Sequence, residues 1–530
     1  MTSDRNRQII GQFCLLLLCC LLQSALAEEV PPAEPPQKTP AVGPEAGKKT
    51  ADKRVRKVPE LPRTPSAALI LAPYERIPFT FEGLQLFKGN GSAGEVQNGR
   101  NLYQVGADNQ IAGRKVGIGV FTCAIATSDP QNPTGPGLAS FIVLSAFTNN
   151  LGNANVQYTN PPVRIAYRQP LTGRGVEAVD YRCHNTYFTA MACSESDYIT
   201  LVGTPPALTN YNQSVRVGRR PMGVVLTSGA LINKYAFVTC QADGTLAAVS
   251  APDRDWGSVD ERLGETTFFD AATGKQLERR EPAEQRISAK KPVAVRPTPV
   301  SKLGQKLAPG DIRLIQSGHW LDYKGGETFV PVDSPDQRAY VIVANYGGGS
   351  VMVFDILPFI TGKGRDLVLL GGFPGIPNPR KMLLWGDDLY VGSNPGTTVS
   401  KLSLRGLPAI AKAKPLVIQV GKDPMGMAMG HNLLWVANSG SDSVSVVRDD
   451  REIGRLDRSN SMPMKEPYGI YCSGEGARVI VTNRGDEYAT WWNLKMYPAG
   501  PVERPEDLII SSDRLWVGPG ATAIDGDYNP

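Results

Sequence analysis

Residues 434–447, LWVANSGSDSVSVV, contain an apolar run, a turn of small and polar residues, and then an alternation of serine with valine. This order is typical of a β-hairpin, in which a tight turn joins two short strands. Variants of the stretch recur at 235–249 (YAFVTCQADGTLAAV), 340–354 (YVIVANYGGGSVMVF), 390–399 (YVGSNPGTTV) and 479–488 (VIVTNRGDEY), with a truncated version at 515–520 (LWVGPG). A repeated hairpin therefore dominates the C-terminal half of the chain.

The spacing of the hairpins predicts how they are arranged. Asn345 and Asn394 are 49 residues apart, Asn394 and Asn438 are 44 apart, and Asn438 and Asn483 are 45 apart. Periods of about 40 to 50 residues, with four short strands in each, are those of β-propeller blades. We therefore expect an all-β protein folded as a β-propeller, with seven blades as the expected number.

A second signal keeps step with the first. The motif Pro-x-Gly occurs at Pro221, Pro424 and Pro467, which precede the Cys or Asn of the following hairpin by 19, 14 and 16 residues. Proline suits the first residue of a strand, and glycine permits another backbone to approach closely. Two signals in register favour one repeated unit over chance similarity.

The repeats resemble a known family. Val436-Ala437-Asn438 and Val481-Thr482-Asn483, each followed by a glycine-containing turn, are similar to the YVTN-type β-propeller repeats of exported bacterial and archaeal proteins. The resemblance runs from about Arg219 to the C-terminus, with an interruption at a charged stretch, and it is weak from Tyr74 to Asn212. It implies a propeller that acts outside the cytoplasm.

The N-terminus supports export. Residues 1–27 contain arginines, then an apolar run, and then Ala25-Leu26-Ala27, the order of a cleavable signal peptide. Residues 28–73 are rich in proline and carry a basic cluster, so they predict a disordered linker. No later segment has the roughly 20 apolar residues of a membrane helix, so we expect no transmembrane segment in the mature chain. The predicted location is the periplasm, the cell surface or the medium.

We assign the remaining residues, 74–530, to the propeller. Residues 74–212 are either degenerate blades of the same ring or a separate β domain. Because the last repeat is short, we favour a single ring that closes by borrowing a strand from the other end of the chain. The charged, proline-containing stretch 275–309 is expected to be an insertion between strands.

The cysteines fit an oxidising compartment. Cleavage of the signal leaves five cysteines, of which Cys183 and Cys193 are close in sequence and are the candidates for a disulfide. Cys240 lies in an expected strand, where a buried free thiol is an equally good account.

Composition excludes several functions. A net charge of +5 over 530 residues, without a basic stripe, predicts no nucleic-acid partner. The chain has three histidines, and it lacks the motifs of serine hydrolases, nucleotide-binding loops and c-type haem attachment. We therefore assign no catalytic residue, no metal ligand and no cofactor from the sequence.

Five residues are candidates for ligand binding. Asn345, Asn438 and Asn483 recur at the same repeat position, where the alternative role is to cap the hairpin turn. Trp491 and Trp492 are adjacent in a strand and face opposite sides, so one of them is expected to face outward and bind a sugar or a protein.

Two functions follow from these observations. The first is a non-catalytic binding or assembly module for an envelope protein, polymer or glycan. The alternative is an exported enzyme or enzyme subunit, such as a lactone hydrolase or a dehydrogenase component, with its site at the propeller channel.

Overall fold

The fold was analysed in a computed structural model of the whole chain. It describes residues 110–111, 114–115, 117–129, 137–149, 156–159, 164–171, 173–181, 188–203, 212–227, 235–250, 265–280, 284–286, 308–316, 338–410, 414–430, 432–473, 478–495 and 502–526. The predicted signal peptide (1–27) and linker (28–73) lie outside these residues. Among the described helices, none has the length and apolar character needed to cross a membrane.

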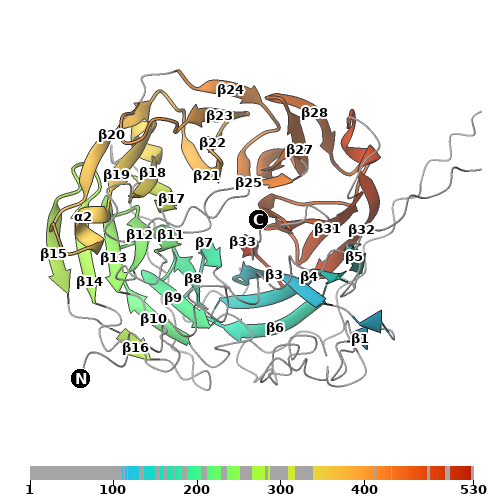
Figure 1. Cartoon of the computed structure of the whole chain (residues 1–530), viewed down its shortest axis with the longest axis horizontal. Helices are drawn as coiled ribbons and strands as arrows, with labels where there is room; N and C mark the ends of the chain where they lie inside the picture. Colours follow the sequence, from blue (N-terminus) through green and yellow to red (C-terminus); the bar gives the residue numbers. More distant parts are fainter. Residues whose placement is uncertain are drawn as a thin grey trace, which may run out of the picture. The chain divides into compact units, whose positions relative to one another are not determined.

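Seven antiparallel sheets of four or five strands form a ring in the described part of the chain (Figure 1). The first strand of each sheet contacts the first strands of its two neighbours, in the order β33, β7, β11, β17, β21, β25, β29 and back to β33. The seven-bladed β-propeller predicted from the sequence is therefore confirmed.

We number the blades I to VII and give their strands from the channel outward. Blade I consists of β33 (Ala521–Gly526), β3 (Gly117–Thr127), β4 (Leu138–Asn149) and β5 (Val156–Thr159), with β6 (Arg164–Pro170) also paired to β4. Blade II consists of β7 (Val176–Tyr181), β8 (Phe188–Cys193), β9 (Tyr198–Gly203), β10 (Asn212–Arg216) and β16 (Glu284–Arg286). Blade III consists of β11 (Pro221–Leu226), β12 (Tyr235–Cys240), β13 (Thr245–Ser250), β14 (Thr266–Asp270) and β15 (Gln276–Arg280).

The remaining blades have four strands each. Blade IV consists of β17 (Pro309–Gln316), β18 (Ala339–Asn345), β19 (Ser350–Asp355) and β20 (Val368–Pro374), and blade V of β21 (Pro379–Trp385), β22 (Asp388–Ser393), β23 (Thr398–Ser403) and β24 (Leu416–Gln419). Blade VI consists of β25 (Pro424–Gly430), β26 (Leu433–Asn438), β27 (Ser443–Arg448) and β28 (Arg451–Leu456), and blade VII of β29 (Pro467–Cys472), β30 (Arg478–Asn483), β31 (Tyr488–Leu494) and β32 (Ile509–Trp516). Outside the blades, the described residues form the short hairpin β1 (Gln110–Ile111) and β2 (Arg114–Lys115), the helix α2 (Leu357–Ile360) and the 3₁₀ turns η3 (Tyr346–Gly348), η4 (Ser439–Ser441) and η5 (Pro505–Asp507).

The two sequence signals lie opposite each other in the strand register. The proline that begins an inner strand pairs with the last residue of the second strand, as in Pro424 with Asn438 and Pro467 with Asn483. In blade V the partner of Pro379 is Ser393 and not Asn394, so our choice of Asn394 as the repeat anchor was wrong by one residue.

The ring closes between the two ends of the described chain. β33 pairs with β3, so the C-terminal strand becomes the inner strand of the blade that the N-terminal strands build (Figure 1). The stretch 515–520, which we interpreted as a truncated hairpin, is the end of outer strand β32 and the turn before β33. This closure pairs the inner edge of β3, which would otherwise be open.

Two segments of uncertain assignment contribute strands to this ring. The strands from β3 to β9, within 74–212, form most of blades I and II, and β10 begins at the last residue of that segment. Of the charged stretch 275–309, β15 is the outermost strand of blade III, and β16 pairs with β10 of blade II. Residues 287–307 lie outside the described residues.

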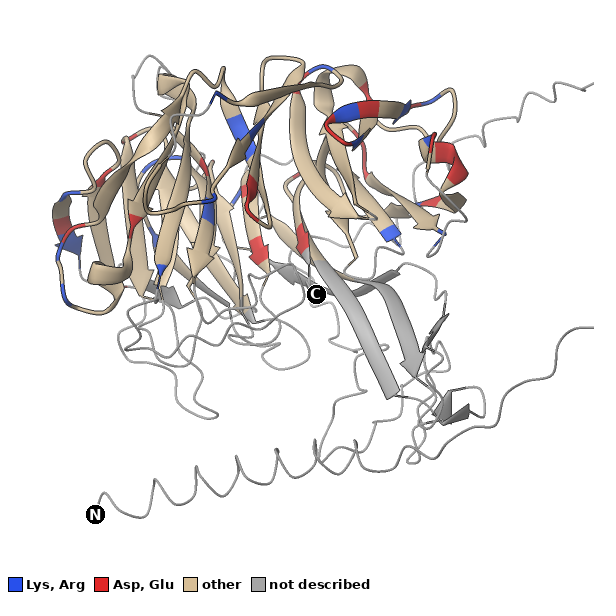
Figure 2. Cartoon of the chain, turned by 45° about the horizontal axis from the view of Figure 1, so that its top comes forward, with Lys and Arg blue, Asp and Glu red and all other residues tan. Residues whose placement is uncertain are grey.

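Each blade is packed on both faces. Seven buried apolar clusters occupy the seven interfaces between neighbouring blades. Both sides of a strand are therefore apolar, and charged residues are sparse over the strands in Figure 2. No blade can bury its two faces alone, so the free energy of burial stabilises the ring as a whole.

Glycines let the inner strands approach one another at the axis. A methyl group on Gly426 would lie 2.6 Å from the carbonyl oxygen of Tyr468, and one on Gly469 would lie 2.6 Å from that of Thr522. A methyl group on Gly310 would instead be 3.5 Å from its nearest neighbour, the carbonyl oxygen of Ala344. The first two glycines are required by space, and Gly310 is not.

We expect Gly426→Ala to lower the free energy of unfolding by about 1–3 kcal/mol, because the added carbon meets backbone of the next blade that cannot move alone. The matched variant Gly310→Ala should change it by no more than about 0.5 kcal/mol. Urea unfolding of both variants measures the difference, and equal losses would contradict the close approach of blades VI and VII.

Candidate functional site

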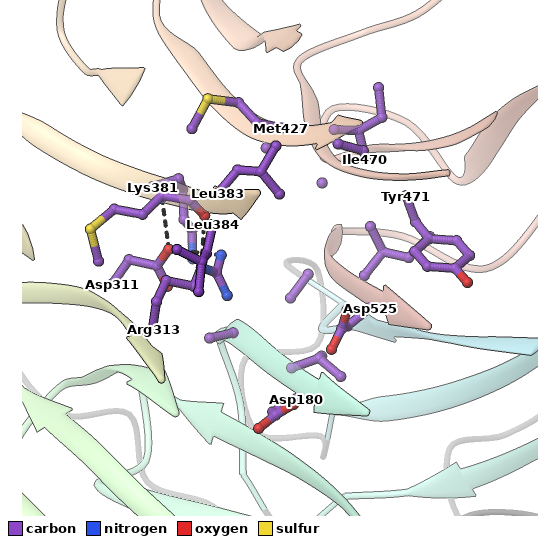
Figure 3. A pocket seen from close by; sticks show the side chains of 18 of the residues that line it. Asp180, Asp311, Arg313, Lys381, Leu383, Leu384, Met427, Ile470, Tyr471 and Asp525 are labelled. Carbon is purple, nitrogen blue, oxygen red and sulfur yellow. Dashed lines mark hydrogen bonds and ion pairs between the residues drawn. The ribbon is translucent and has the colours of Figure 1, made fainter. Parts of the chain in front are cut away.

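A pocket lies in the central channel, lined by the inner strands of the blades. Its volume is about 230 Å³, and six of the seven inner strands contribute more than one residue to its wall. Figure 3 shows Asp311, Arg313 and Lys381 together on one side of this pocket, with Asp180 and Asp525 on the other. The pocket is thus polar on two opposite sides, and residues such as Leu383 and Met427 line the wall between them.

The third residue of each inner strand shows where the channel departs from the repeat. It is glycine or alanine in blades I, II, III, VI and VII, as the close approach at the axis requires. Blade IV has Asp311 at this position and blade V has Lys381. These two neighbouring blades therefore place charged side chains where the other five have almost none.

Asp311 and Arg313 connect blade IV to blade V. The Asp311 carboxylate, which is 2% exposed, accepts a hydrogen bond of 2.8 Å from the backbone N–H of Met382 and lies 2.9 Å from the Arg313 guanidinium. Arg313 in turn donates from Nε to the carbonyl oxygen of Met382 at 2.7 Å. Together, Asp311 and Arg313 form hydrogen bonds with the backbone N–H and carbonyl oxygen of Met382, which lies on the edge of β21 that no other strand pairs.

A second cluster crosses the channel. Glu177 of blade II lies 3.4 Å from the Arg380 guanidinium of blade V and accepts a hydrogen bond from the Tyr468 hydroxyl of blade VII. Lys381 Nζ donates to the backbone carbonyl oxygen of Glu177. All four residues are at the second or third position of their strands, so they lie at one end of the channel, which we call the mouth.

The environment of the mouth shifts the pKa values of these groups. Burial by itself would raise the pKa of Glu177, but Arg380, Lys381 and the Tyr468 hydrogen bond outweigh it and hold the pKa below its ordinary value. Burial lowers the pKa of Lys381 against the opposing effects of Asp311 and Glu177. Burial and the neighbouring Glu177 raise the pKa of Tyr468. At neutral pH Glu177 is therefore an anion and Tyr468 is neutral.

Two further acids have structural partners deeper in the channel. Asp525 of blade I accepts from the backbone N–H of Tyr181 at 2.9 Å, and Asp180 of blade II accepts from that of Leu226 at 2.6 Å. Each carboxylate thus caps a backbone donor on the inner edge of the next blade. The acids of the channel hold blades together, as the Asp311 carboxylate does.

The asparagines predicted to bind a ligand lie inside the hairpins. Asn438 and Asn483 are 0% exposed, and Asn345 is 6% exposed. Asn438 Nδ2 donates to Ser443 and Ser445, and Asn483 Nδ2 donates to Tyr488 and Thr490 across its turn. Asn345 Oδ1 accepts from the backbone N–H of Ala308. The contacts of Asn438 and Asn483 match the alternative role, in which the side chain fixes the hairpin, whereas Asn345 ties its hairpin to the residue before β17.

Neither of the predicted tryptophans faces outward, so that expectation was wrong. Trp492 is 0% exposed, stacks on Trp435 at 6.4 Å, and donates to Ser461 in the interface of blades VI and VII. Trp491 is 9% exposed and packs into the interface of blades VII and I. Successive residues of a strand do face opposite sides, but in a propeller both sides are covered by another blade.

Cys193 carries a free, fully buried thiol, so the structure does not contain the predicted bridge to Cys183, which lies outside the described residues. The thiol packs against Gly173 and lies 3.9 Å from the Thr200 hydroxyl, and burial raises its pKa to about 12. Cys240 is also free and buried, as one of the two accounts predicted.

From the sequence we did not select Glu177, Asp311, Arg380, Lys381 or Tyr468 as site residues. A signal for three of them was present, because Pro309-Gly-Asp and Pro379-Arg-Lys occupy the place of Pro-x-Gly in their repeats. Charged residues where the repeat has glycine therefore mark blades IV and V, which place charged side chains in the channel.

No family model and no curated protein matches this chain. Among solved structures, it is similar to the periplasmic gluconolactonase of Pseudomonas aeruginosa, with 12% identity and a TM-score of 0.47 over 78% of this chain and 100% of that one. It is also similar to two putative 6-phosphogluconolactonases. The one from Bacteroides fragilis has 11% identity and a TM-score of 0.44 over 77% of this chain and 98% of that one. The one from Bacteroides uniformis has 10% identity and a TM-score of 0.45 over 77% of this chain and 99% of that one. These likenesses concern the fold.

We expect Glu177→Gln to lower the free energy of unfolding by about 3 kcal/mol at pH 7, because it leaves the buried Arg380 charge without its carboxylate. The control Asp387→Asn removes an exposed pair with Arg405 and should cost less than about 1 kcal/mol. Denaturant titrations measure both, and a Glu177 variant as stable as the control would contradict the cross-channel bridge.

The same variant predicts a pH dependence. Because the pKa of Glu177 is lower in the folded chain than its ordinary value of 4.5, its stabilising effect is complete above that pH. The effect is lost as the pH falls through the folded-state pKa. The stability difference between wild type and Glu177→Gln should therefore shrink on acidification from pH 7 to pH 3, as measured by urea unfolding, and a constant difference would exclude a lowered pKa.

Proposed function

We propose that this chain is an exported, non-catalytic binding module of the YVTN-type propeller family, which takes an envelope protein, polymer or glycan at the mouth of its channel. Export rests on residues 1–27, whose order is that of a signal peptide. The binding role rests on the mouth, where charged side chains of blades II and V and the Tyr468 hydroxyl of blade VII are held together beside a pocket.

The protonation states at the mouth favour binding over catalysis. A general base works best when its pKa is near the working pH, whereas the pKa of Glu177 is lowered. A general acid must likewise give up its proton readily, whereas the pKa of Tyr468 is raised. The other channel carboxylates already accept hydrogen bonds from backbone N–H groups of the next blade.

One observation favours the alternative, an enzyme such as a lactone hydrolase. Lys381 is buried in the channel and its pKa is lowered, which is how proteins prepare a lysine to act as a base or nucleophile. Its ammonium group donates to the carbonyl oxygen of Glu177, however, and this contact stabilises the protonated form.

Binding and turnover can be measured on the same preparation. Calorimetric titration of the chain without residues 1–27 should give saturable binding of at least one member of a panel of neutral and acidic oligosaccharides, while pH-stat assays with gluconolactone show no hydrolysis above the uncatalysed rate. Leu383→Trp, which fills the channel, should abolish the binding. Leu369→Trp, on the outer strand β20 where the leucine is 39% exposed, should not.

Lactone hydrolysis that is lost in Lys381→Met would replace the binding proposal with the enzyme. Binding that survives Leu383→Trp and is lost in Leu369→Trp would move the site from the channel to the outer rim.

A further inference from the structure

The mouth contains more positive than negative side chains. Around the Glu177 carboxylate are Arg380 at 3.4 Å, Lys381 through its contact with the Glu177 backbone, and two further arginines, Arg220 and Arg484, which interact with Glu177 electrostatically. Arg484 also stacks over the Tyr468 ring at 5.5 Å. Adding the neighbouring pair of Asp311 and Arg313 leaves the excess of cations unchanged.

Arg220 occupies a strained position. The residue before the inner strand is left-handed in six blades, and the others at this position are Gly175, Asn378, Asp423, Glu466 and Gly520. Arg220, with a φ of 56°, takes a backbone conformation that glycine, asparagine and aspartate adopt more easily. The chain thus holds a long cationic side chain at a position where the left-handed backbone is unfavourable for it. Residues with such strained backbone conformations are enriched at functional sites.

The side chain of Arg220 has an unused donor. Its Nη1 atom is buried and has no hydrogen-bond partner in the described part of the chain. Burial and the nearby Arg380 both lower the pKa of Arg220, so two guanidinium groups are held near each other with one carboxylate to share. Like charges at short range are unfavourable unless an anion joins them.

A second unpaired group lies next to Arg220. The Gln241 side chain is 2% exposed, and within the described residues neither its Oε1 nor its Nε2 has a partner. Gln241 directly follows β12, and its backbone N–H donates to the carbonyl oxygen of Arg220 at 3.0 Å. Tyr346 and Arg484 hold the equivalent position in blades IV and VII, and both interact with the mouth residues.

We propose that the mouth binds an oxyanion of the ligand, a carboxylate or a phosphate, between Arg220 and Arg380, with Gln241 donating from its amide. The proposal rests on the binding function of the mouth and names the chemical group that it recognises. Guanidinium groups suit this role, because their planar N–H donors match two oxygens of a carboxylate or phosphate at once. Glu177 holds Arg380 in place through their ion pair, and its negative charge offsets part of the positive charge of the mouth.

The test uses the chain without residues 1–27 and two probes, sodium phosphate and sodium gluconate, titrated at constant ionic strength against sodium chloride. We expect saturable binding of one or both probes by calorimetry and none of chloride. Binding of phosphate alone identifies a phosphate group, binding of gluconate alone identifies a carboxylate, and binding of both shows that the site recognises the shared oxyanion.

Arg220→Gly is the decisive variant. It should weaken the affinity about tenfold or more, the effect of a lost hydrogen bond to a charged group. It should also leave the melting temperature unchanged or higher, because glycine suits the left-handed backbone. The matched control Glu466→Gly makes the same backbone change at the equivalent position of blade VII and removes a carboxylate, so it should keep the affinity for the anion.

Two results would overturn the proposal. The first is a calorimetric signal for phosphate and gluconate no larger than that for chloride. The second is an anion affinity of Arg220→Gly equal to that of wild type. Failure of the anion site is distinguishable from failure of the binding function. If neutral oligosaccharides bind in the channel but phosphate and gluconate do not, the binding function stands and only the anion site is excluded.

Discussion

Each inner strand of the propeller has one hydrogen-bonding edge that no strand of its own blade pairs, and seven such edges meet around the axis. Unpaired backbone groups are costly when they are removed from water. The chain meets this constraint with carboxylates from the preceding blade: Asp525 for Tyr181, Asp180 for Leu226, and Asp311 for Met382. These hydrogen bonds join neighbouring blades at the radius where the backbones come closest.

The same crowding explains why charged residues in the channel are concentrated at few positions. Glycine and alanine are needed at the third residue wherever a neighbouring backbone lies within reach, as at Gly426 and Gly469. Asp311 and Lys381 replace them in two adjacent blades, and Glu177, Arg380 and Tyr468 occupy the second position in three. The mouth is thus built at the second and third positions of the inner strands, and its charges are connected across the channel rather than along one blade.

Much of the fold could be predicted from the sequence, because a hairpin is a local structure. The Pro-x-Gly motif and the Asn that follows it face each other in one ladder, so their spacing reports a real pairing. The error at Asn394 arose where the loop Asn394-Pro395-Gly396 imitates the repeat one residue late. The error at Trp491 and Trp492 had another origin. Alternation along a strand says which residues share a face, but it does not say whether that face meets water or another blade.

By itself, the sequence determined the repeating hairpin and its period of about 45 residues, because both depend on neighbours in the chain. The tertiary structure alone decided which side chains meet at the mouth. Glu177 is 203 residues from Arg380 and 291 residues from Tyr468, and no local pattern relates them. They meet because closing seven blades into a ring brings the starts of their inner strands to one end of the axis.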